Sequence, residues 1–359
     1  MSEKIQVALI LGGRNSENFR SCQAATDVLL ALQAKDYEVS AYGITMEANW
    51  ISFNDLASLQ NALKTDGFEL NDESAKNISG TSSSLVIPDS LIDAHVVFST
   101  MLGPWAADGT FQGLLDFTAI RYVGSDTLGT TVAFDKPTAK LLINSMEVPT
   151  PRHITITDKA WRRDPLSCIA RATSLKLPII IKPARGSNGL GVSVARFPRD
   201  LKKTIDIARQ FDGRIIAEKY HKNSRLFELN IVEDEKRKPL FSEIIETKLN
   251  KKDSIFNFIY RAEKSDFSFE KATDLEVEVK NLMEEYARKV FEVLKLSGYA
   301  QIEFLIDTEG ELLVQEVNTQ PYLGKDGSFA LSWKEAGKTY EDLLDDIIKE
   351  SLERPVGLV

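Results

Sequence analysis

Two stretches of the sequence carry side chains whose types and spacing suit phosphate chemistry. The first, IIIKPARGSNGLGVSV (residues 179–194), places Lys182 at the end of a β-branched run, followed by three glycines within six residues. Since a second β-branched run follows, the pattern predicts strand, loop and strand, whereas a Rossmann or P-loop glycine cluster leads directly into a helix. The N–H groups of such a loop can wrap phosphate beside the charge of Lys182. The alternative is an ordinary solvated lysine at a strand end.

The second stretch, QIEFLIDTEGELLVQEVNT (residues 301–319), reads as a β-hairpin with oxygen-bearing side chains on one face. Strand alternation puts Glu316 and Asn318 on the same face, and pairing around the turn at 307–310 places Glu303 opposite roughly residues 314–318. Two carboxylates and an amide oxygen form a ligand set that suits Mg²⁺ bridging phosphates. A solvent-facing polar stripe is the alternative, but Glu316 and Asn318 lie in a largely apolar strand. The hairpin therefore predicts a metal site.

Two more segments supply polar groups for a nucleotide. A helix is expected over about 136–145, and its first residue, Lys136, offers a second cation. Proline at the second position of this helix is tolerated in a first turn. A strand is expected over 214–220, and an adenine could bond its backbone edge at Glu218, Lys219 and Tyr220.

Composition limits the class of protein. The 359 residues suggest two or three domains, and a net charge of −9 argues against a nucleic-acid or anionic-membrane partner. Cys22 and Cys168 are too few for a disulfide framework or a zinc site. No apolar run approaches the roughly 20 residues of a membrane span. We therefore expect a soluble cytoplasmic protein.

The elements that must position the chemistry change character along the chain. The N-terminal part alternates as in an α/β fold, with strands expected at 6–11, 37–44, 95–100 and 121–123, helices at 22–33 and 113–119, and a surface excursion at 64–87. The later part predicts helices at 161–174, 275–296 and 339–352, paired antiparallel strands at 226–232 and 240–246, and a mobile loop at 250–272.

Four stretches in the same order resemble the ATP-grasp ligases and, within them, the D-alanine–D-alanine ligases. They are VALILGGRNSE, ADGTFQGLLDFTAIRYVGSDTLGTTVAFDKPTAK, LPIIIKPARGSNGLGVSVAR and QIEFLIDTEGELLVQEVNTQP, and the resemblance covers nearly the whole chain. It implies an α/β and α+β fold of three domains. These would be a Rossmann-like pre-ATP-grasp domain at 1–130, a central ATP-grasp lobe with the phosphate lid at 131–216, and a C-terminal lobe with the Mg²⁺ site at 217–359.

The resemblance also implies a reaction: ATP-dependent amide formation through an acyl phosphate, releasing ADP and phosphate. It implies two Mg²⁺ ions, for which Mn²⁺ could substitute, small amino-acid or amine substrates, and a homodimer. Glu17 stands where the family's glutamate meets the ammonium of the first substrate. The implied nucleotide-binding residues are Lys136, Lys182, Ser187, Asn188, Glu218, Lys219 and Tyr220.

Departures from the family pattern concentrate in the substrate pocket. Leu102 and Ala107 replace a histidine and an acidic residue, and Asn188 and Gly189 replace serines of the lid. Gln301 replaces the arginine that braces the oxyanion and the acceptor carboxylate, and Tyr322 replaces a glycine. Trp105 and Ser328 would also line the pocket.

Two further positions depart from the family. The ribose-binding glutamate aligns with Leu226, and Glu228 on the same strand face could substitute for it. The lysine of the family's mobile loop is best matched by Arg261. Because the nucleotide and metal residues are intact, we predict that ATP use is retained while the substrates have changed. An ordinary D-alanine–D-alanine ligase and a non-catalytic nucleotide-binding protein are the alternatives.

Overall fold

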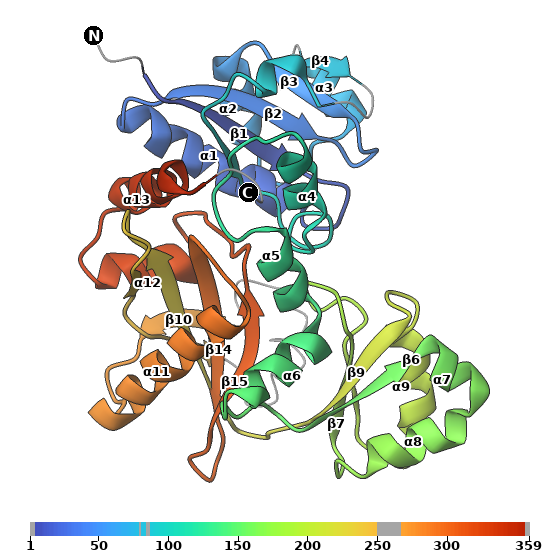
Figure 1. The fold of residues 1–359 in the computed structure, drawn as a ribbon. Helices are drawn as coiled ribbons and strands as arrows, with labels where there is room; N and C mark the ends of the chain where they lie inside the picture. The colour runs from blue at the N-terminus through green and yellow to red at the C-terminus, as the bar shows by residue number, and fades with distance from the viewer. Residues whose placement is uncertain (1–3, 79, 84–86, 250–266, 356–359) are drawn as a thin grey trace.

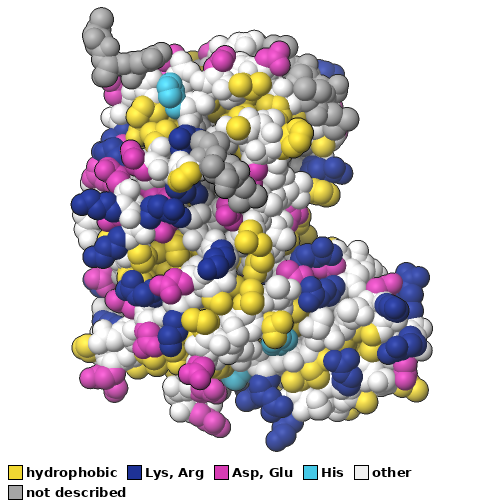
Figure 2. Space-filling view, viewed as in Figure 1, with side chains coloured by type: hydrophobic (Ala, Val, Ile, Leu, Met, Phe, Trp, Pro, Cys, Tyr) yellow, Lys and Arg dark blue, Asp and Glu magenta, His cyan; other side chains and the backbone are white. Residues whose placement is uncertain are grey.

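The computed structural model describes residues 4–78, 80–83, 87–249 and 267–355, which form three β-sheets with helices packed against them (Figure 1). No helix within these residues is long and apolar enough to cross a membrane. On the face of the molecule in Figure 2, positive and negative side chains are interspersed, and the surface is indented between the N-terminal part and the lobe at the lower right.

The N-terminal sheet has the strand order β4-β3-β2-β1-β5. Its strands are β1 (Gln6–Gly12), β2 (Glu38–Ile44), β3 (Trp50–Phe53), β4 (Gly80–Ser83) and β5 (Val96–Ser99). β1 runs parallel to both β2 and β5, whereas β2–β3 and β3–β4 are antiparallel. After β1 the chain forms β2 on one side of that strand, and it later forms β5 on the other side. The carboxyl ends of β1 and β5 therefore flank a topological switch point, where open α/β sheets bind ligands.

Alternating residues of β1 face two separate cores. Leu9 and Leu11 pack with helix α1 (Asn18–Ala34), and Ala8 and Ile10 pack with helix α4 (Thr110–Phe117). The remaining helices of this part are α2 (Leu56–Leu63), α3 (Asp72–Asn77) and the 3-10 helix η1 (Asp89–Leu91).

The central sheet has the order β6-β9-β7-β8 and is antiparallel throughout. Its strands are β6 (His153–Thr157), β7 (Ile179–Pro183), β8 (Ser193–Ala195) and β9 (Arg214–Lys219), and its helices are α7 (Asp158–Arg163), α8 (Pro165–Thr173), η2 (Pro198–Asp200) and α9 (Leu201–Ala208). β7 pairs with β8 across the glycine loop, which confirms the predicted hairpin.

The C-terminal sheet has the order β13-β12-β10-β14-β15, with β11 paired to β10. Its strands are β10 (Arg225–Glu233), β11 (Pro239–Phe241), β12 (Ile245–Leu249), β13 (Phe267–Lys271), β14 (Tyr299–Ile306) and β15 (Leu312–Asn318). The helices around it are α5 (Thr127–Phe134), α6 (Lys136–Ser145), α11 (Val277–Val293), α12 (Ser328–Glu335) and α13 (Tyr340–Glu353).

Two helices join separate parts of the chain. α6 begins where Asp135 accepts a hydrogen bond from the Thr138 N–H, and its Ala139 and Ile143 pack into the core of the C-terminal sheet. α13 instead packs on α1, and its apolar residues belong to the core around β1. Beyond α13, Arg354 donates hydrogen bonds to the Tyr122 and Gly124 carbonyls at 3.1 and 2.6 Å. The last helix therefore completes the N-terminal part.

Local signals explain several differences from the expected elements. The helix expected over 161–174 is two helices, because Asp164 caps a new helix and Pro165 occupies its first position. The expected strand at 121–123 forms only a single bridge between Val97 and Tyr122.

Other differences concern the segments expected to be irregular. The 64–87 excursion contains α3 and β4, and β13 occupies the last part of the loop expected over 250–272, whose earlier residues 250–266 lie outside the described residues. The strand expected over 240–246 is divided between β11 and β12. The domain boundaries after residues 130 and 216 stay a proposal.

Candidate active site

Lys136 and Lys182 reach the same carboxylate from different elements. Lys136 begins α6, Lys182 lies in β7, and Glu316 lies in β15. The Lys136 Nζ lies 2.9 Å from Glu316 Oε1, and the Lys182 Nζ lies 3.9 Å from Glu316 Oε2. Burial alone would raise the pKa of Glu316, but the two ammonium groups hold it below its usual range. The structure thus brings together residues that were predicted from three separate stretches.

Glu218, in β9, forms ion pairs with Lys182 and with a second lysine, Lys140. Glu218 Oε2 lies 2.8 Å from Lys182 Nζ, and Glu218 Oε1 lies 3.2 Å from Lys140 Nζ. Burial raises the pKa of Glu218, yet Lys140 and Lys182 together lower it to about 2. Burial likewise lowers the pKa of Lys182, but Glu218 and Glu316 outweigh it and raise this pKa. Lys182 is therefore a buried cation between two carboxylates.

Lys140 was missed by the sequence analysis. It is fully enclosed, its pKa is lowered chiefly by burial, and its Nζ also donates to the Gln315 carbonyl at 2.8 Å. The sequence did contain a signal for Lys140. Residues four positions apart lie on the same face of a helix, and Lys140 follows Lys136 by four positions. Both lysines of α6 point at the C-terminal hairpin.

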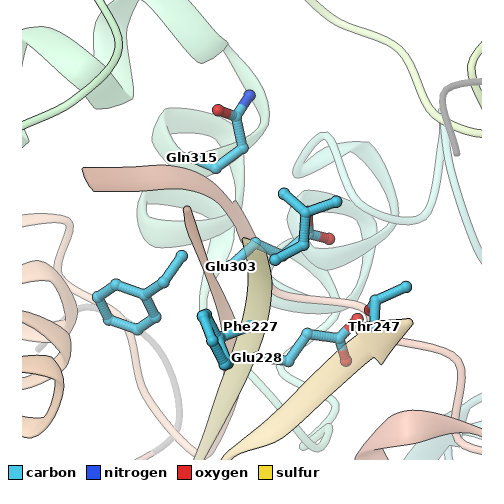
Figure 3. A pocket seen from close by; sticks show the side chains of 7 residues that line it. Phe227, Glu228, Thr247, Glu303 and Gln315 are labelled. Atoms are coloured by element: carbon cyan, nitrogen blue, oxygen red, sulfur yellow. The ribbon is translucent and has the colours of Figure 1, made fainter. Parts of the chain in front are cut away.

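Three glutamates lie side by side on neighbouring strands of the C-terminal sheet. Glu303 in β14 stands directly opposite Glu228 in β10 and Glu316 in β15, so the three share one face. Figure 3 shows Glu228 and Glu303 among the side chains that line a small pocket. The register between β14 and β15 shifts next to the Glu303–Glu316 pair, because Gln315 forms a β-bulge there. Without the bulge, Gln315 would stand opposite Glu303 in place of Glu316.

The donor set fits Mg²⁺ in its chemistry. Asn318 lies two residues beyond Glu316, and its Oδ1 accepts from the Gln320 N–H at 3.0 Å. Within the described residues, no group of three or more histidine, cysteine or acidic side chains is arranged to hold an ion by itself. Mg²⁺ commonly uses one or two carboxylates and takes its other oxygens from water and phosphate. Glu303, Glu316 and Asn318 therefore fit an ion shared with a nucleotide.

Gln301 lies on the same sheet face as the carboxylate row, opposite Asn318. Its Nε2 donates to Glu228 Oε2 at 2.8 Å and lies 3.3 Å from Ser328 Oγ. Glu228 is thus engaged with Gln301 and stands beside Glu303, in the row of three carboxylates. Its predicted role toward a ribose stays a proposal.

The lid loop touches both the lysine cluster and the N-terminal sheet. The Gly186 carbonyl accepts from Lys136 Nζ at 2.9 Å. A side chain at Gly103 would bring its Cβ within 2.6 Å of Ser187 Oγ, so the lid contacts the loop that follows β5. Asn188 has a φ of 53°, the left-handed region that asparagine tolerates better than most residues. Ser187 therefore lies where the lid loop meets the N-terminal part, and Asn188 follows it.

The edge expected to meet an adenine is partly engaged in the protein. β9 lies between β6 and β7, and the N–H groups of Lys219 and Tyr220 donate to the Arg152 and Pro178 carbonyls at 2.8 and 3.3 Å. These two donors serve the sheet, so hydrogen bonds from this segment to an adenine would have to come from other atoms.

The predicted substrate pocket gathers at the switch point of the N-terminal sheet. Glu17 is buried at the start of α1, its carboxylate lies 3.3 Å from Arg20 Nη1, and the Arg20 guanidinium lies over the Tyr322 ring at 4.7 Å. Gly103 approaches the Glu17 side chain, and Leu102 beside it is buried.

One of the predicted residues, Trp105, stands apart from this group. Trp105 is 45% exposed on the other side of the loop that carries Leu102. Arg261 lies outside the described residues.

Comparison with known proteins places the chain in one group. Residues 6–125 match the family model described as D-ala D-ala ligase N-terminus, and residues 142–349 match the model described as D-ala D-ala ligase C-terminus. A D-alanine–D-alanine ligase of Pseudarthrobacter chlorophenolicus is 28% identical over 368 residues, which cover 99% of this chain and 96% of the relative.

Solved structures agree on the fold. The D-alanine–D-alanine ligase from Coxiella burnetii has a TM-score of 0.83 at 19% identity and covers 98% of this chain and 95% of its own. The VanG D-Ala:D-Ser ligase from Enterococcus faecalis has a TM-score of 0.78 at 20% identity and covers 97% and 100%. These likenesses confirm the predicted multi-domain α/β and α+β architecture of the ATP-grasp type.

Proposed function

This chain belongs to the D-alanine–D-alanine ligase family, and on that premise we propose that it joins a carboxylate to an amine through an acyl phosphate, with substrates other than the usual D-alanine pair. The family consists of ADP-forming ATP-grasp ligases that make a C–N bond. The observation that carries the proposal is the convergence of Lys136 and Lys182 on Glu316, beside the Glu303 carboxylate. Two cations close to two carboxylates that could bind Mg²⁺ form an arrangement that suits phosphoryl transfer.

The first step is attack of a substrate carboxylate on the γ-phosphate of ATP, which releases ADP. Lys136 and Lys182 can exchange a carboxylate partner for phosphate oxygens and neutralise the charge that spreads over the transferring group. Lys140 and Glu218 hold Lys182 in place for this task. Mg²⁺ bound by Glu303, Glu316 and Asn318 would supply further charge neutralisation at the phosphates.

The second step is attack of the amine on the acyl phosphate, which forms the C–N bond and releases phosphate. Glu17 would accept hydrogen bonds from the ammonium of the first substrate, as the resemblance implies, and its burial at the start of α1 supports this role. Water would hydrolyse the acyl phosphate, so the site must keep water away from this intermediate. The contact between Ser187 of the lid and Gly103 supports a role for the lid in covering the intermediate.

Support for changed substrates comes from the residues around Gln301 and Tyr322. Gln301 carries no charge for an acceptor carboxylate, and its amide already donates to Glu228, whose charge would repel such a carboxylate. Tyr322 occupies space beside Arg20, where the family has glycine. One structural relative is itself named for D-Ala:D-Ser, so its acceptor differs from that of the proteins named for D-alanine alone.

The test is phosphate release by the purified protein with MgATP across pairs of amino acids, dipeptides and amines. We expect turnover with a pair other than D-alanine with D-alanine. Robust turnover on D-alanine alone would identify an ordinary D-alanine–D-alanine ligase. ATP binding without phosphate release for any pair, under conditions where a related ligase turns over, would identify a non-catalytic nucleotide-binding protein.

We further propose two Mg²⁺ ions per site, replaceable by Mn²⁺, and a homodimer in the cytoplasm. The resemblance to the family supports these points. Metal titration of turnover and sedimentation velocity test the ion count and the dimer.

A further inference from the structure

The N-terminal sheet carries a cavity that the proposed ligase reaction does not use. It measures about 540 Å³ and lies between α4, the carboxyl ends of β1 and β2, and the amino end of β3. This volume falls within the range of small-molecule sites. Its walls are mainly apolar and aromatic: Ile44, Trp50, Met101, Trp105, Phe111 and Leu114. We call it the α4 cavity.

The loop that follows β5 separates the α4 cavity from the candidate active site. Leu102 and Gly103 belong to the side near Glu17 and Ser187, whereas Met101, Pro104 and Trp105 line the cavity. The Asn15 Nδ2 fixes this loop by donating to the Leu102 and Pro104 carbonyls at 2.9 and 2.7 Å. The same loop therefore forms a wall of both sites.

A cation and a strained aromatic residue stand at the cavity. The Arg14 guanidinium lies 4.8 Å from the centroid of the Trp105 ring, and both residues line the cavity. Trp105 has a φ of 75°, which is costly for a bulky residue and typical of binding and catalytic sites. In the described part of the chain, no carboxylate forms an ion pair with Arg14. Its charge is therefore available to a ligand.

We propose that the α4 cavity binds a small apolar molecule that carries a carboxylate, as a second ligand outside the ligase site. The apolar part lies among Trp50, Phe111 and Leu114, and the carboxylate meets Arg14.

A second copy of the chain is the competing occupant, since Phe117 is 91% exposed at the rim of the cavity. An aromatic side chain would satisfy the apolar walls but would leave the charge of Arg14 without a partner. The volume of the cavity, about 540 Å³, and this charge favour the small anion.

The first experiment is calorimetric titration of the full-length protein with 3-phenylpropionate and with its neutral analogue 3-phenylpropan-1-ol. We expect the acid to bind about tenfold more tightly, in line with a charge-assisted hydrogen bond. Because no ATP or substrate is present, the result is independent of the proposed ligase activity. Equal affinity for the acid and the alcohol would overturn the proposal.

Matched variants locate the site. Arg14→Gln should abolish the preference for the acid, and Arg163→Gln, at an exposed arginine in α7, should retain it. Leu114→Asp should weaken binding of the acid at least tenfold, whereas Leu128→Asp, at an exposed leucine in α5, should not. If Arg14→Gln keeps the preference, the acid binds elsewhere and the proposal is wrong.

Sedimentation velocity decides between the ligand and a second copy. If the protein is a dimer that Leu114→Asp dissociates, and neither the dimer nor the monomer binds the acid, the cavity is a subunit interface. An unchanged oligomeric state together with loss of acid binding in Leu114→Asp supports the proposal.

Discussion

The two halves of the candidate active site are built on different principles. The phosphate half consists of buried, mutually paired charges, in which Lys136, Lys140 and Lys182 alternate with Glu218 and Glu316. The substrate half around Leu102, Gln301 and Tyr322 holds neutral side chains where the family has charged or small ones. Phosphate and metal ions accept few residue types, so the first half stays recognisable. A substrate pocket can change with the substrate, and our proposal of changed substrates rests on the second half.

The largest effect should follow removal of a charge from the phosphate half. Lys182→Met takes away a cation held between Glu218 and Glu316. We expect phosphate release to fall about 10³-fold, at the upper end of losses for one stabilising donor. Steady-state phosphate release measures it, and Lys203→Met, at an exposed lysine in α9, is the control. A loss below tenfold would mean that Lys182 does not act on the transferring phosphate.

The second largest effect should be a loss of folding stability at acidic pH, which arises in the phosphate half. The pKa of Glu218 in the folded protein is lowered to about 2, so its contribution to stability is present above the ordinary glutamate pKa of 4.5 and is lost as pH falls from there toward 2. A shift of this size corresponds to about 3 kcal/mol.

Urea unfolding at several pH values measures this loss. Glu218→Gln should lower stability at neutral pH and should reduce the slope between pH 4.5 and 2 by up to about 1.4 kcal/mol per pH unit, the share of one carboxyl group. Parallel pH profiles for the two proteins would show that Glu218 is not held by its lysines.

A metal-ligand change should have the third largest effect. Glu316→Gln keeps the shape but removes one charge from the carboxylate row, and we expect the Mg²⁺ concentration for half-maximal activity to rise about 100-fold, or ~2.7 kcal/mol. Glu309→Gln, in the exposed turn of the same hairpin, should leave it unchanged. Metal titration of phosphate release distinguishes a ligand from a residue that only supports the fold, because the latter would change activity at every Mg²⁺ concentration.

The smallest expected effect comes from restoring charge to the substrate half. Gln301→Arg would place a cation opposite Asn318 and beside Glu228, which can pair with it. We expect turnover with D-alanine as acceptor to rise about tenfold, or ~1.4 kcal/mol. Gln301→Met, which also removes the hydrogen bond to Glu228, should not raise it. A decrease with Gln301→Arg would show that this position does not set the acceptor.

Sequence patterns predicted the parts whose signal is local. The β-branched runs around the glycine loop predicted the β7–β8 hairpin. The turn of the last hairpin predicted that Glu303 lies opposite roughly residues 314–318, and the structure pairs it with Glu316. The bulge at Gln315 was not predicted, although it sets this pairing, because one extra residue leaves the alternation on either side unchanged. The break between α7 and α8 was missed although Asp164 and Pro165 announce it.

Contacts between distant segments were beyond the reach of the sequence. Lys140 donates to the carbonyl of Gln315, 175 positions along the chain, and no local pattern specifies that partner. The approach of Ser187 to Gly103 likewise depends on how the central and N-terminal sheets meet. Functional roles for these residues stay predictions until the variants are measured.

The return of α13 to the N-terminal sheet sets an order for folding during synthesis. Leu343, Leu344 and Ile347 belong to the same core as Leu9 and Val28. A ribosome releases the first sheet long before these residues exist, so that sheet waits for the end of the chain to complete its core. The described residues that form the core of the central sheet all lie within 154–217, so this sheet can finish earlier. The part that is made first is therefore among the last to become stable.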